Sequence, residues 1–394
     1  MKKEDLISET PFRKQKGFQD QYLKIIPPTA KDLAIEQKIQ SLKSHHAYNQ
    51  LSIDQKSIFE LIGESYQKKL LNHVLEPKHF VLSGHEVLEY DQLDEEQIPR
   101  YLVYRYRYNK YPQLKIVDNF PPCLQIEPSS LCNFRCIMCY QSDESFSSKS
   151  SQLMGHMSLD LFKQIVDQSE GNIEAITLAS RGEPFLNPHI ADMLLYCKGK
   201  FLALKINTNA SLLSDANIHA ILSSDVQTIV FSVDAADKEL YEKIRVKGNF
   251  DRLVKNLRRF QEIKTTQYPK AKIITRITGV KINDQQNMHD MEKRWSEYAD
   301  VVAFTTYTPW QDTYHNEVNS ILEPCTEFWR RMFVWQDGAI NPCDVDYKSQ
   351  LSQWNVSKMN ISEIWRSQGY NAMRQIHLDQ QRNRLEPCKR CVIT

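Results

Sequence analysis

Cys132, Cys136 and Cys139 stand close together in the chain, in the spacing C-x3-C-x2-C. Three thiolates on one short loop can hold three irons of a 4Fe-4S cube and leave the fourth iron without a protein ligand. A zinc site is the alternative, but structural zinc sites usually take four ligands in C-x2-4-C pairs. No fourth cysteine or histidine stands near this loop in the sequence. The spacing therefore favours an iron-sulfur cluster with one iron open to a further ligand.

Four more cysteines stand in the C-terminal part of the chain. Cys325 and Cys343 are separated by seventeen residues, and Cys388 and Cys391 form a C-x2-C pair. Such a set can bind zinc or one 4Fe-4S cube in which every iron has a cysteine ligand. The chain has nine cysteines, an odd number, and most fall into these two groups. Grouped cysteines without a signal peptide predict metal ligands rather than disulfides.

After residue 118, short apolar runs alternate with helix-length amphipathic segments. The six runs are 124–126, 173–179, 201–206, 228–233, 273–277 and 301–304. Strands that alternate with helices predict a parallel sheet with right-handed crossovers. We therefore expect an α/β fold over residues 119–310, either an open parallel sheet or a partial (β/α)6 TIM-like barrel. In such folds ligands gather at the carboxyl ends of the strands.

Polar motifs follow several of these runs. Gly182-Glu183-Pro184 comes after the second run, where a carboxylate can accept hydrogen bonds from an ammonium group. The third run ends at Asn207, in a polar turn. The other candidates are Ser232 and Asp234 at the end of the fourth run, Arg245 on the next helix and Arg276 within the fifth run. A planar guanidinium group is suited to a carboxylate ligand.

The cysteine spacing and the order of these motifs resemble those of the radical S-adenosylmethionine (radical SAM) enzymes. The resemblance implies that the three clustered cysteines are catalytic and hold a 4Fe-4S cluster, whose open iron chelates SAM. It places Met138 against the adenine, with the aromatic Tyr140 just after the last cysteine. Two positions depart from the family pattern, since Arg181 replaces the first glycine of G-G-E-P and Ala210 replaces the glycine of T-N-G.

At the strand ends the resemblance implies direct contacts with SAM. The Gly182-Glu183-Pro184 segment corresponds to the one that binds the amino group of the methionine. Asn207 begins the turn that resembles T-N-G, and Ser232 in the S-x-D strand end corresponds to a contact with the ribose or carboxylate. The carboxylate of SAM is assigned to Arg245 or Arg276.

The four C-terminal cysteines resemble those of the twitch domain, a shorter relative of the SPASM domain, and imply one auxiliary 4Fe-4S cluster in residues 311–394. In the family, an electron from a donor such as flavodoxin or ferredoxin produces a 5'-deoxyadenosyl radical, which removes a hydrogen atom from the substrate. A fully ligated auxiliary cube can accept the second electron. We therefore expect a radical SAM oxidoreductase that dehydrogenates a polar small molecule, such as a sugar or amino alcohol. The alternatives are an epimerase, a peptide-modifying maturase and a zinc-stabilised protein without catalysis.

Composition limits the other classes of function. Fifty basic and forty-nine acidic residues give a net charge of +1, so bulk charge gives no sign of nucleic-acid or membrane binding. No signal-like or membrane-length apolar run is present, and we expect a soluble, cytoplasmic protein. Residues 1–118 predict a mainly helical extension of unknown role, with one strand at 102–108 where tyrosine and arginine alternate. An aromatic loop around Trp310 is expected mainly to pack in the core.

Overall fold

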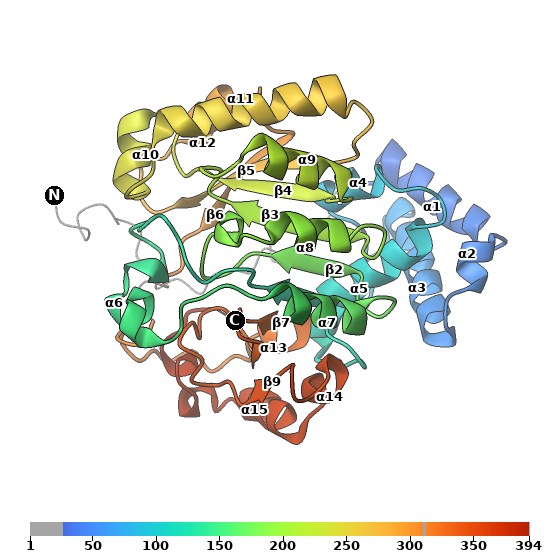
Figure 1. The fold of residues 1–394 in the computed structure, drawn as a ribbon. Coiled ribbons are helices and arrows are strands. Elements are labelled where there is room, and N and C mark those ends of the chain that lie inside the picture. Colours follow the sequence, from blue (N-terminus) through green and yellow to red (C-terminus); the bar gives the residue numbers. More distant parts are fainter. Residues whose placement is uncertain (1–26, 310–312, 394) are drawn as a thin grey trace.

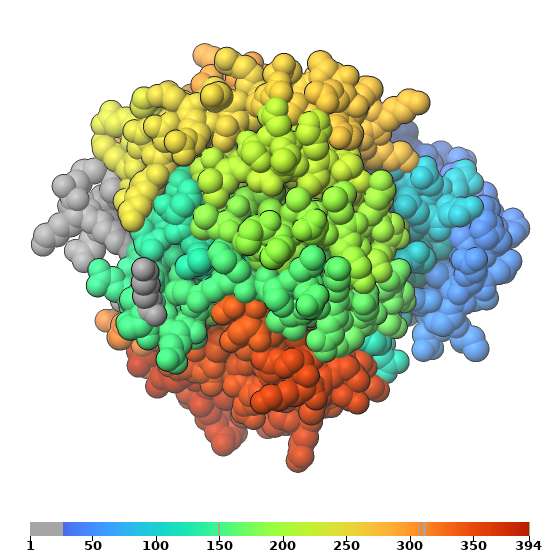
Figure 2. All heavy atoms as spheres, in the orientation of Figure 1, coloured from blue at the N-terminus to red at the C-terminus, as the bar shows by residue number. Residues whose placement is uncertain are grey.

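A computed structural model describes residues 27–309 and 313–393. Figure 1 shows a helical N-terminal region, a central sheet with helices along it, and a C-terminal region against one side of that sheet. Figure 2 shows the three regions in contact with one another. The boundary expected at residue 310 and the side chain of Trp310 lie outside the described residues. In the described ranges, no helix has the length and apolar character needed to cross a bilayer.

The N-terminal region is helical, as expected. Its helices are α1 (Ala30–Leu42), α2 (His46–Asn49), α3 (Ile53–Leu70), α4 (Gly84–Tyr90) and α5 (Ile98–Leu114). Thr29 and Ser52 form capping boxes at the starts of α1 and α3, which satisfies free backbone N–H groups there. The apolar core of this region continues onto Cys123 and Ala175 at the amino ends of two barrel strands. The N-terminal helices therefore cover the amino-terminal end of the sheet.

The strand predicted at 102–108 is wrong, because these residues lie inside α5. Tyr104 and Tyr108 contact each other edge to face at 6.0 Å, one helical turn apart. Arg105 is buried, and its Nε donates to a carboxylate oxygen of Glu86 on α4 at 2.8 Å. Side chains three and four residues apart lie on one face of a helix. The alternation of tyrosine and arginine at 102–108 is therefore compatible with a helix, in which these aromatic and charged side chains have partners.

The central sheet contains all six predicted strands. They are β1 (Cys123–Ile126), β2 (Ala175–Leu178), β3 (Ala203–Thr208), β4 (Thr228–Ser232), β5 (Ile274–Lys281) and β6 (Val301–Thr306). Their order is β6-β5-β4-β3-β2-β1, and every neighbouring pair is parallel. The main helices between and after them are α7 (Leu159–Ser169), α8 (Ile190–Tyr196), α9 (Asp215–Ser223), α10 (Lys238–Ile244), α11 (Phe250–Gln267) and α12 (Met288–Trp295). The expected partial barrel is confirmed.

The two faces of this sheet differ sharply in polarity. One face packs against the helices in a single apolar core, and its members are Leu124, Ile126, Ile176, Leu178, Leu204, Ile206, Ile229, Phe231 and Ile277. Side chains alternate between faces along a strand. The intervening residues include the apolar Val230, Ile274 and Val280. The polar ones among them form what we call the polar face: Gln125, Thr177, Lys205, Asn207, Ser232, Arg276 and Thr278. The sheet therefore presents hydrogen-bonding and basic groups away from its helices.

The C-terminal region adds to the same sheet. Strand β7 (Arg331–Val334) pairs parallel with β1, and the antiparallel β8 (Ala339–Asn341) and β9 (Trp354–Asn355) follow it. The chain turns at Asp337-Gly338 between β7 and β8, and Gly338 has the positive φ of 84° that favours glycine. Two helices follow, α14 (Ile361–Trp365) and α15 (Gln368–Leu378). Two short helices, α6 (Glu144–Ser147) and α13 (Glu327–Arg330), complete the α-helices of the described residues.

Candidate SAM and iron-sulfur site

The cysteine loop follows β1, with Cys136 buried and Cys132 and Cys139 half-buried. Backbone N–H groups of Phe134 and Gln141 donate to Sγ of Cys132 and Cys139 at 3.4 and 3.5 Å. Hydrogen bonds to sulfur are common around iron-sulfur clusters and tune their potentials. Burial raises the pKa of Cys136 to about 12, with the charge of Arg245 opposing the rise and that of Cys139 contributing to it. Neighbouring thiolates repel one another in a buried loop, and binding to the positively charged iron atoms of one cluster would compensate this repulsion. The loop therefore fits a 4Fe-4S group.

The Gly182-Glu183-Pro184 segment lies directly against the cysteine loop. The backbone N–H of Glu183 donates to the carbonyl oxygen of Leu131 at 2.8 Å. A Cβ atom on Gly182 would lie 2.4 Å from the carbonyl oxygens of both Leu131 and Ser129. Such distances are far below van der Waals contact. Glycine is therefore required here by the close approach of two backbone segments, while Pro184 opens the short helical turn that follows.

We expect Gly182→Ala to displace the cysteine loop and to lower the free energy of unfolding by about 1–3 kcal/mol, because the added methyl group overlaps backbone atoms. Denaturant unfolding of the apoprotein and iron content after anaerobic reconstitution measure the two effects. Gly84→Ala is the matched control, since a Cβ atom there meets nothing within 4 Å. Equal behaviour of the two variants would contradict this account of Gly182.

Glu183 is held by the end of the third strand. Its carboxylate accepts hydrogen bonds from Oγ1 of Thr208 at 2.7 Å and from the backbone N–H of Asn209 at 2.8 Å. Burial raises the pKa of Glu183, although these hydrogen bonds oppose the rise. The Asn209 side chain also donates to Asn133 in the cysteine loop at 3.0 Å. The carboxylate is thus fixed next to the cluster loop, where the family resemblance places the amino group of SAM.

The remaining predicted positions on β3 and in the cysteine loop are near this site but differ in their surroundings. Asn207 belongs to the polar face, and its side-chain oxygen is buried with no hydrogen-bond partner in the described structure. Ala210 has φ of 60°, a conformation that glycine adopts without strain. Met138 is buried in the apolar core. Tyr140 is buried as well, and its hydroxyl donates to the carbonyl oxygen of Ser180 at 2.7 Å.

Arg245 reaches the cysteine loop from the end of α10. Its Nη2 lies 2.7 Å from Oδ2 of Asp234, and its Nη1 donates to Sγ of Cys136 at 3.8 Å. Asp234 in turn accepts a hydrogen bond from the backbone N–H of Val280 at 2.7 Å. Ser232, at the end of β4, lies two residues before Asp234. The structure therefore brings Arg245 and Asp234 to the cluster loop as a buried ion pair.

Arg276 lies farther from the cysteine loop than Arg245 does, and its contact with the SAM carboxylate stays a prediction. It lies in the amino-terminal half of β5, four residues before Val280, whose backbone contacts Asp234. Burial lowers the pKa of Arg276, and the charged groups that act on it are Glu89 and Arg105 of the N-terminal helices. The sequence placed this arginine in a strand but could not show how far along the strand the cofactor end begins.

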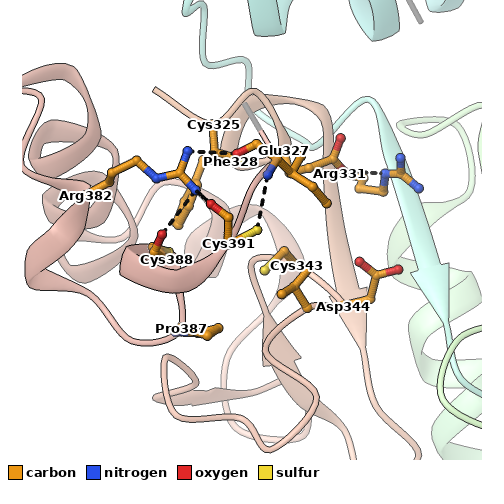
Figure 3. A pocket seen from close by; sticks show the side chains of 12 residues that line it. Cys325, Glu327, Phe328, Arg331, Cys343, Asp344, Arg382, Pro387, Cys388 and Cys391 are labelled. Atoms are coloured by element: carbon orange, nitrogen blue, oxygen red, sulfur yellow. Dashed lines mark hydrogen bonds and ion pairs between the residues drawn. The ribbon is translucent and has the colours of Figure 1, made fainter. Parts of the chain in front are cut away.

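The four C-terminal cysteines line one cavity of about 180 Å³ (Figure 3). This volume is several times the ~30 Å³ that one water molecule occupies in the liquid. Burial raises the pKa of Cys343 and Cys388 well above the ordinary range, and neighbouring cysteines add to the rise. In the described ranges, no group of three His, Cys, Asp or Glu side chains is arranged to bind a single metal ion. The four cysteines instead surround the cavity. The donor set fits a four-cysteine cluster.

Arg382 organises this cavity and was not singled out from the sequence. Its guanidinium donates to the carbonyl oxygens of Cys388 at 3.2 Å, Cys391 at 3.0 Å and Ile393 at 2.8 Å. The backbone N–H of Ile393 then donates to Sγ of Cys391 at 3.5 Å. One buried arginine therefore fixes the turn that carries the C-x2-C pair. Nothing in the sequence spacing indicates this role.

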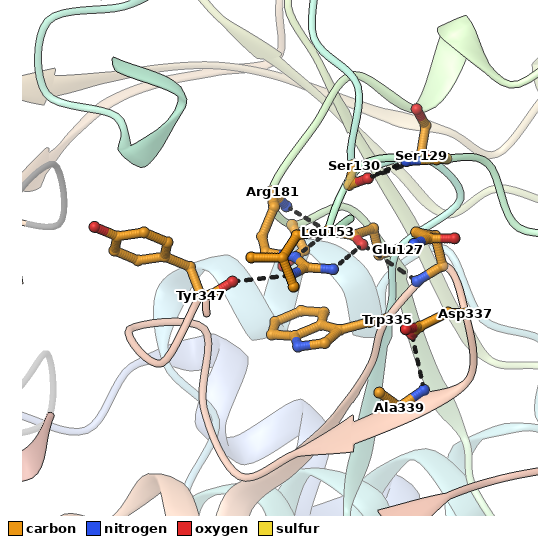
Figure 4. A network of polar contacts seen from close by, with 12 residues as sticks. Glu127, Ser129, Ser130, Leu153, Arg181, Trp335, Asp337, Ala339 and Tyr347 are labelled. Carbon is orange, nitrogen blue, oxygen red and sulfur yellow. Dashed lines mark hydrogen bonds and ion pairs between the residues drawn. The ribbon is translucent and has the colours of Figure 1, made fainter. Parts of the chain in front are cut away.

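Arg181 explains the departure from the family pattern. Its guanidinium forms two hydrogen bonds with the carboxylate of Glu127, at 2.6 and 2.7 Å, and donates to the carbonyl oxygen of Tyr347 at 2.9 Å (Figure 4). It also lies 4.2 Å from the ring centre of Trp335. Tyr347 stacks on Tyr140 at 5.1 Å. Arg181 thus joins the end of β1 to the C-terminal region, between the two cysteine groups.

We expect Arg181→Met to lower the free energy of unfolding by about 3–5 kcal/mol, because Glu127 would remain buried without its counter-charge. Denaturant unfolding of the two proteins measures the loss. The double variant Arg181→Met with Glu127→Gln should recover much of it. Arg259→Met removes a comparable but exposed pair with Asp215 and should cost far less; a similar loss in both arginine variants would contradict the buried-pair explanation.

Comparisons with known proteins agree with this geometry. Residues 126–293 match the family model of the radical SAM superfamily, and residues 325–392 match an iron-sulfur cluster-binding domain, SPASM. The chain belongs to the radical SAM superfamily and has a C-terminal SPASM domain. Its cofactors are SAM, a SAM-binding 4Fe-4S cluster and an auxiliary iron-sulfur centre.

Two curated relatives illustrate the range of similarity. The chain is 34% identical over 116 residues to the tungsten-containing aldehyde ferredoxin oxidoreductase cofactor-modifying protein of Pyrococcus furiosus, covering 28% of this chain and 30% of the relative. It is 26% identical over 253 residues to mycofactocin maturase MftC of Mycobacterium tuberculosis, covering 63% of this chain and 56% of that protein. The chain thus spans about a third to just over half of these relatives.

Two solved structures are partly similar to this chain. BtrN in complex with AdoMet and 2-DOIA has a TM-score of 0.47 at 16% identity, covering 70% of this chain and 94% of that chain. SuiB of Streptococcus suis bound to precursor peptide SuiA has a TM-score of 0.47 at 17% identity, covering 82% and 80%.

Proposed function

We propose that this radical SAM enzyme carries out a two-electron oxidation of its substrate. When bound, the cluster and SAM supply a 5'-deoxyadenosyl radical that takes a hydrogen atom from a C–H bond. The substrate would then lose one more electron to the auxiliary centre and a proton to solvent or base. Glu183 and the Arg245–Asp234 pair support this proposal by their position at the cysteine loop. The electron that starts the reaction would come from a flavodoxin or ferredoxin.

The observation that carries the oxidation is the four-cysteine cavity. Cys325, Cys343, Cys388 and Cys391 line it together and supply one ligand for each iron of a cube. An epimerase needs a hydrogen donor, usually a cysteine thiol, near the substrate radical. Cys123 begins β1 at the end covered by the N-terminal helices, and Cys197 is buried. Neither position is suited to a hydrogen donor for the substrate radical, so oxidation remains the preferred reaction.

A peptide is the substrate class that the curated relatives favour. They include mycofactocin maturase MftC, to which this chain is similar over 63% of its length, and the subtilosin biosynthesis protein AlbA, over 36%. A polar small molecule, such as a sugar or amino alcohol, is the second candidate. It is favoured by residues 27–118, where the described elements are helices and not the strands that begin many leader-peptide modules.

The test is an anaerobic assay of the reconstituted enzyme with SAM and a reductant. Candidate peptides and polar metabolites are added separately, and 5'-deoxyadenosine and products are followed by mass spectrometry. The proposal expects one class to stimulate 5'-deoxyadenosine formation and to yield a product lighter by two hydrogen atoms. A product of unchanged mass with inverted configuration would replace oxidation by epimerisation.

A further inference from the structure

Lys205 and Arg276 share the polar face of the sheet. Lys205 on β3 pairs with Thr228 of β4, and Arg276 on β5 pairs with Val230 of β4. Thr228 and Val230 are two residues apart and therefore point to the same side. Neighbouring strands lie about 4.8 Å apart, so the two backbones are separated by about 10 Å across the sheet. Two long basic side chains can converge over that distance on one small group.

Neither cation is neutralised by a bonded partner in the described structure. Within residues 27–309 and 313–393, the Lys205 ammonium group forms no ion pair or hydrogen bond, and the Arg276 Nε is buried without a hydrogen-bond partner. The acid whose charge acts on both is Glu89. Its carboxylate already accepts from the hydroxyl of Tyr101 at 2.8 Å and lies 3.8 Å from Nη1 of Arg105. The basic pair therefore has charge available for a ligand.

The electrostatic surroundings make this arrangement unfavourable without an anion. Burial lowers the pKa of Lys205 to about 8, with Arg331 and Arg276 lowering it and Cys123 and Glu89 opposing them. Arg331 itself is paired with Glu327 at 2.7 Å. Buried charges are normally retained only where a counter-charge or a ligand compensates them.

We propose that Lys205 and Arg276 bind an oxyanion group of the substrate, either a carboxylate or a phosphate. This inference rests on the proposed function. Arginine supplies a planar fork for two oxygens and lysine a compact charge. Asn207 and Ser232 lie on the same face, nearer the cysteine loop, and can bond the neutral part of the substrate. Lys205 is three residues before the end of β3, so the anion binds about 10 Å from the cofactor end of the sheet.

Competitive labelling of Lys205 tests this site without measuring turnover. The anaerobically purified holoenzyme is treated with trace acetic anhydride across a range of pH, and acetylation is quantified by peptide mass spectrometry. Inorganic phosphate and succinate are the two probes. Oxyanion binding stabilises the charged ammonium and raises its pKa. A rise of about one pKa unit from about 8 lowers the reactive fraction near pH 8 about fivefold. Lys198 is exposed and serves as the internal reference.

Arg276→Met should remove the protection of Lys205, whereas Arg252→Met, on the exposed surface of α11, should keep it. Protection by phosphate alone supports a phosphorylated substrate, and protection by succinate alone supports a carboxylate. Absence of protection by either probe, or protection that survives Arg276→Met, overturns the inference. Cleavage of SAM by the wild-type enzyme is measured in parallel. If the wild-type enzyme does not cleave SAM, that result contradicts the proposed function and not the anion site.

Discussion

Cys136→Ala is expected to abolish reductive cleavage of SAM and to reduce the iron content from about eight to about four atoms per chain. Cys136 is buried, lies between the other two cysteines of its loop, and is contacted by Arg245. Removing one of three thiolates leaves the cluster with too few ligands to bind SAM at a vacant iron. Iron and sulfide analysis of the anaerobic protein and 5'-deoxyadenosine formation measure the two losses.

Cys197→Ala is the matched control for this variant. Cys197 is as thoroughly buried as Cys136 but lies at the end of α8, outside both cysteine groups. We expect it to retain about eight irons and full cleavage of SAM. Residual cleavage by Cys136→Ala above about a tenth of the wild-type rate, a loss smaller than 1.4 kcal/mol in the barrier, would contradict the ligand role.

Cys343→Ala is expected to distinguish the role of the C-terminal cysteine group from that of the cysteine loop. It should lose the auxiliary centre and about four irons, keep formation of 5'-deoxyadenosine, and release no oxidised product. The physical reason is that the first hydrogen transfer depends on the SAM site, while removal of the second electron depends on the cavity that Cys343 lines. Product analysis and 5'-deoxyadenosine measurement on the same samples distinguish these steps.

Cys123→Ala provides the corresponding control, because Cys123 is buried at the amino end of β1 and is not among the cavity residues. It should keep product formation. The opposite result, with Cys343→Ala active and Cys123→Ala inactive, would favour a thiol hydrogen donor over oxidation through an auxiliary centre.

The parts of the fold that depend on local periodicity could be predicted from the sequence. Each barrel strand is a short apolar run next to a helix whose apolar face is equally regular, as in α7, where Phe162, Ile165 and Val166 are buried. Strand β7 could not be placed this way. Its pairing with β1 joins residues more than two hundred positions apart, and local pattern carries no information about that contact. The tyrosine-rich part of α5 failed because alternation over seven residues is too short to distinguish a strand from a helix.

The candidate site also combines features that the local sequence predicts with features that it does not predict. Glycine at 182 and the carboxylate at 183 could be predicted because their spacing after a strand is local. The role of Arg181 depends on Glu127, Tyr347 and Trp335, which three separate segments bring together. The choice between Arg245 and Arg276 depended on depth along the barrel, which the sequence does not encode locally. We propose Arg245, because it forms an ion pair with Asp234 and contacts Cys136 of the cysteine loop.

The most direct measurement is electron paramagnetic resonance of the reduced, anaerobic Cys343→Ala protein, with and without SAM. This variant should retain only the cluster held by Cys132, Cys136 and Cys139. We predict the signal of one reduced 4Fe-4S cluster, with g values that shift when SAM is added because SAM binds the open iron. A protein without this signal, or a signal that SAM leaves unchanged, would contradict the account.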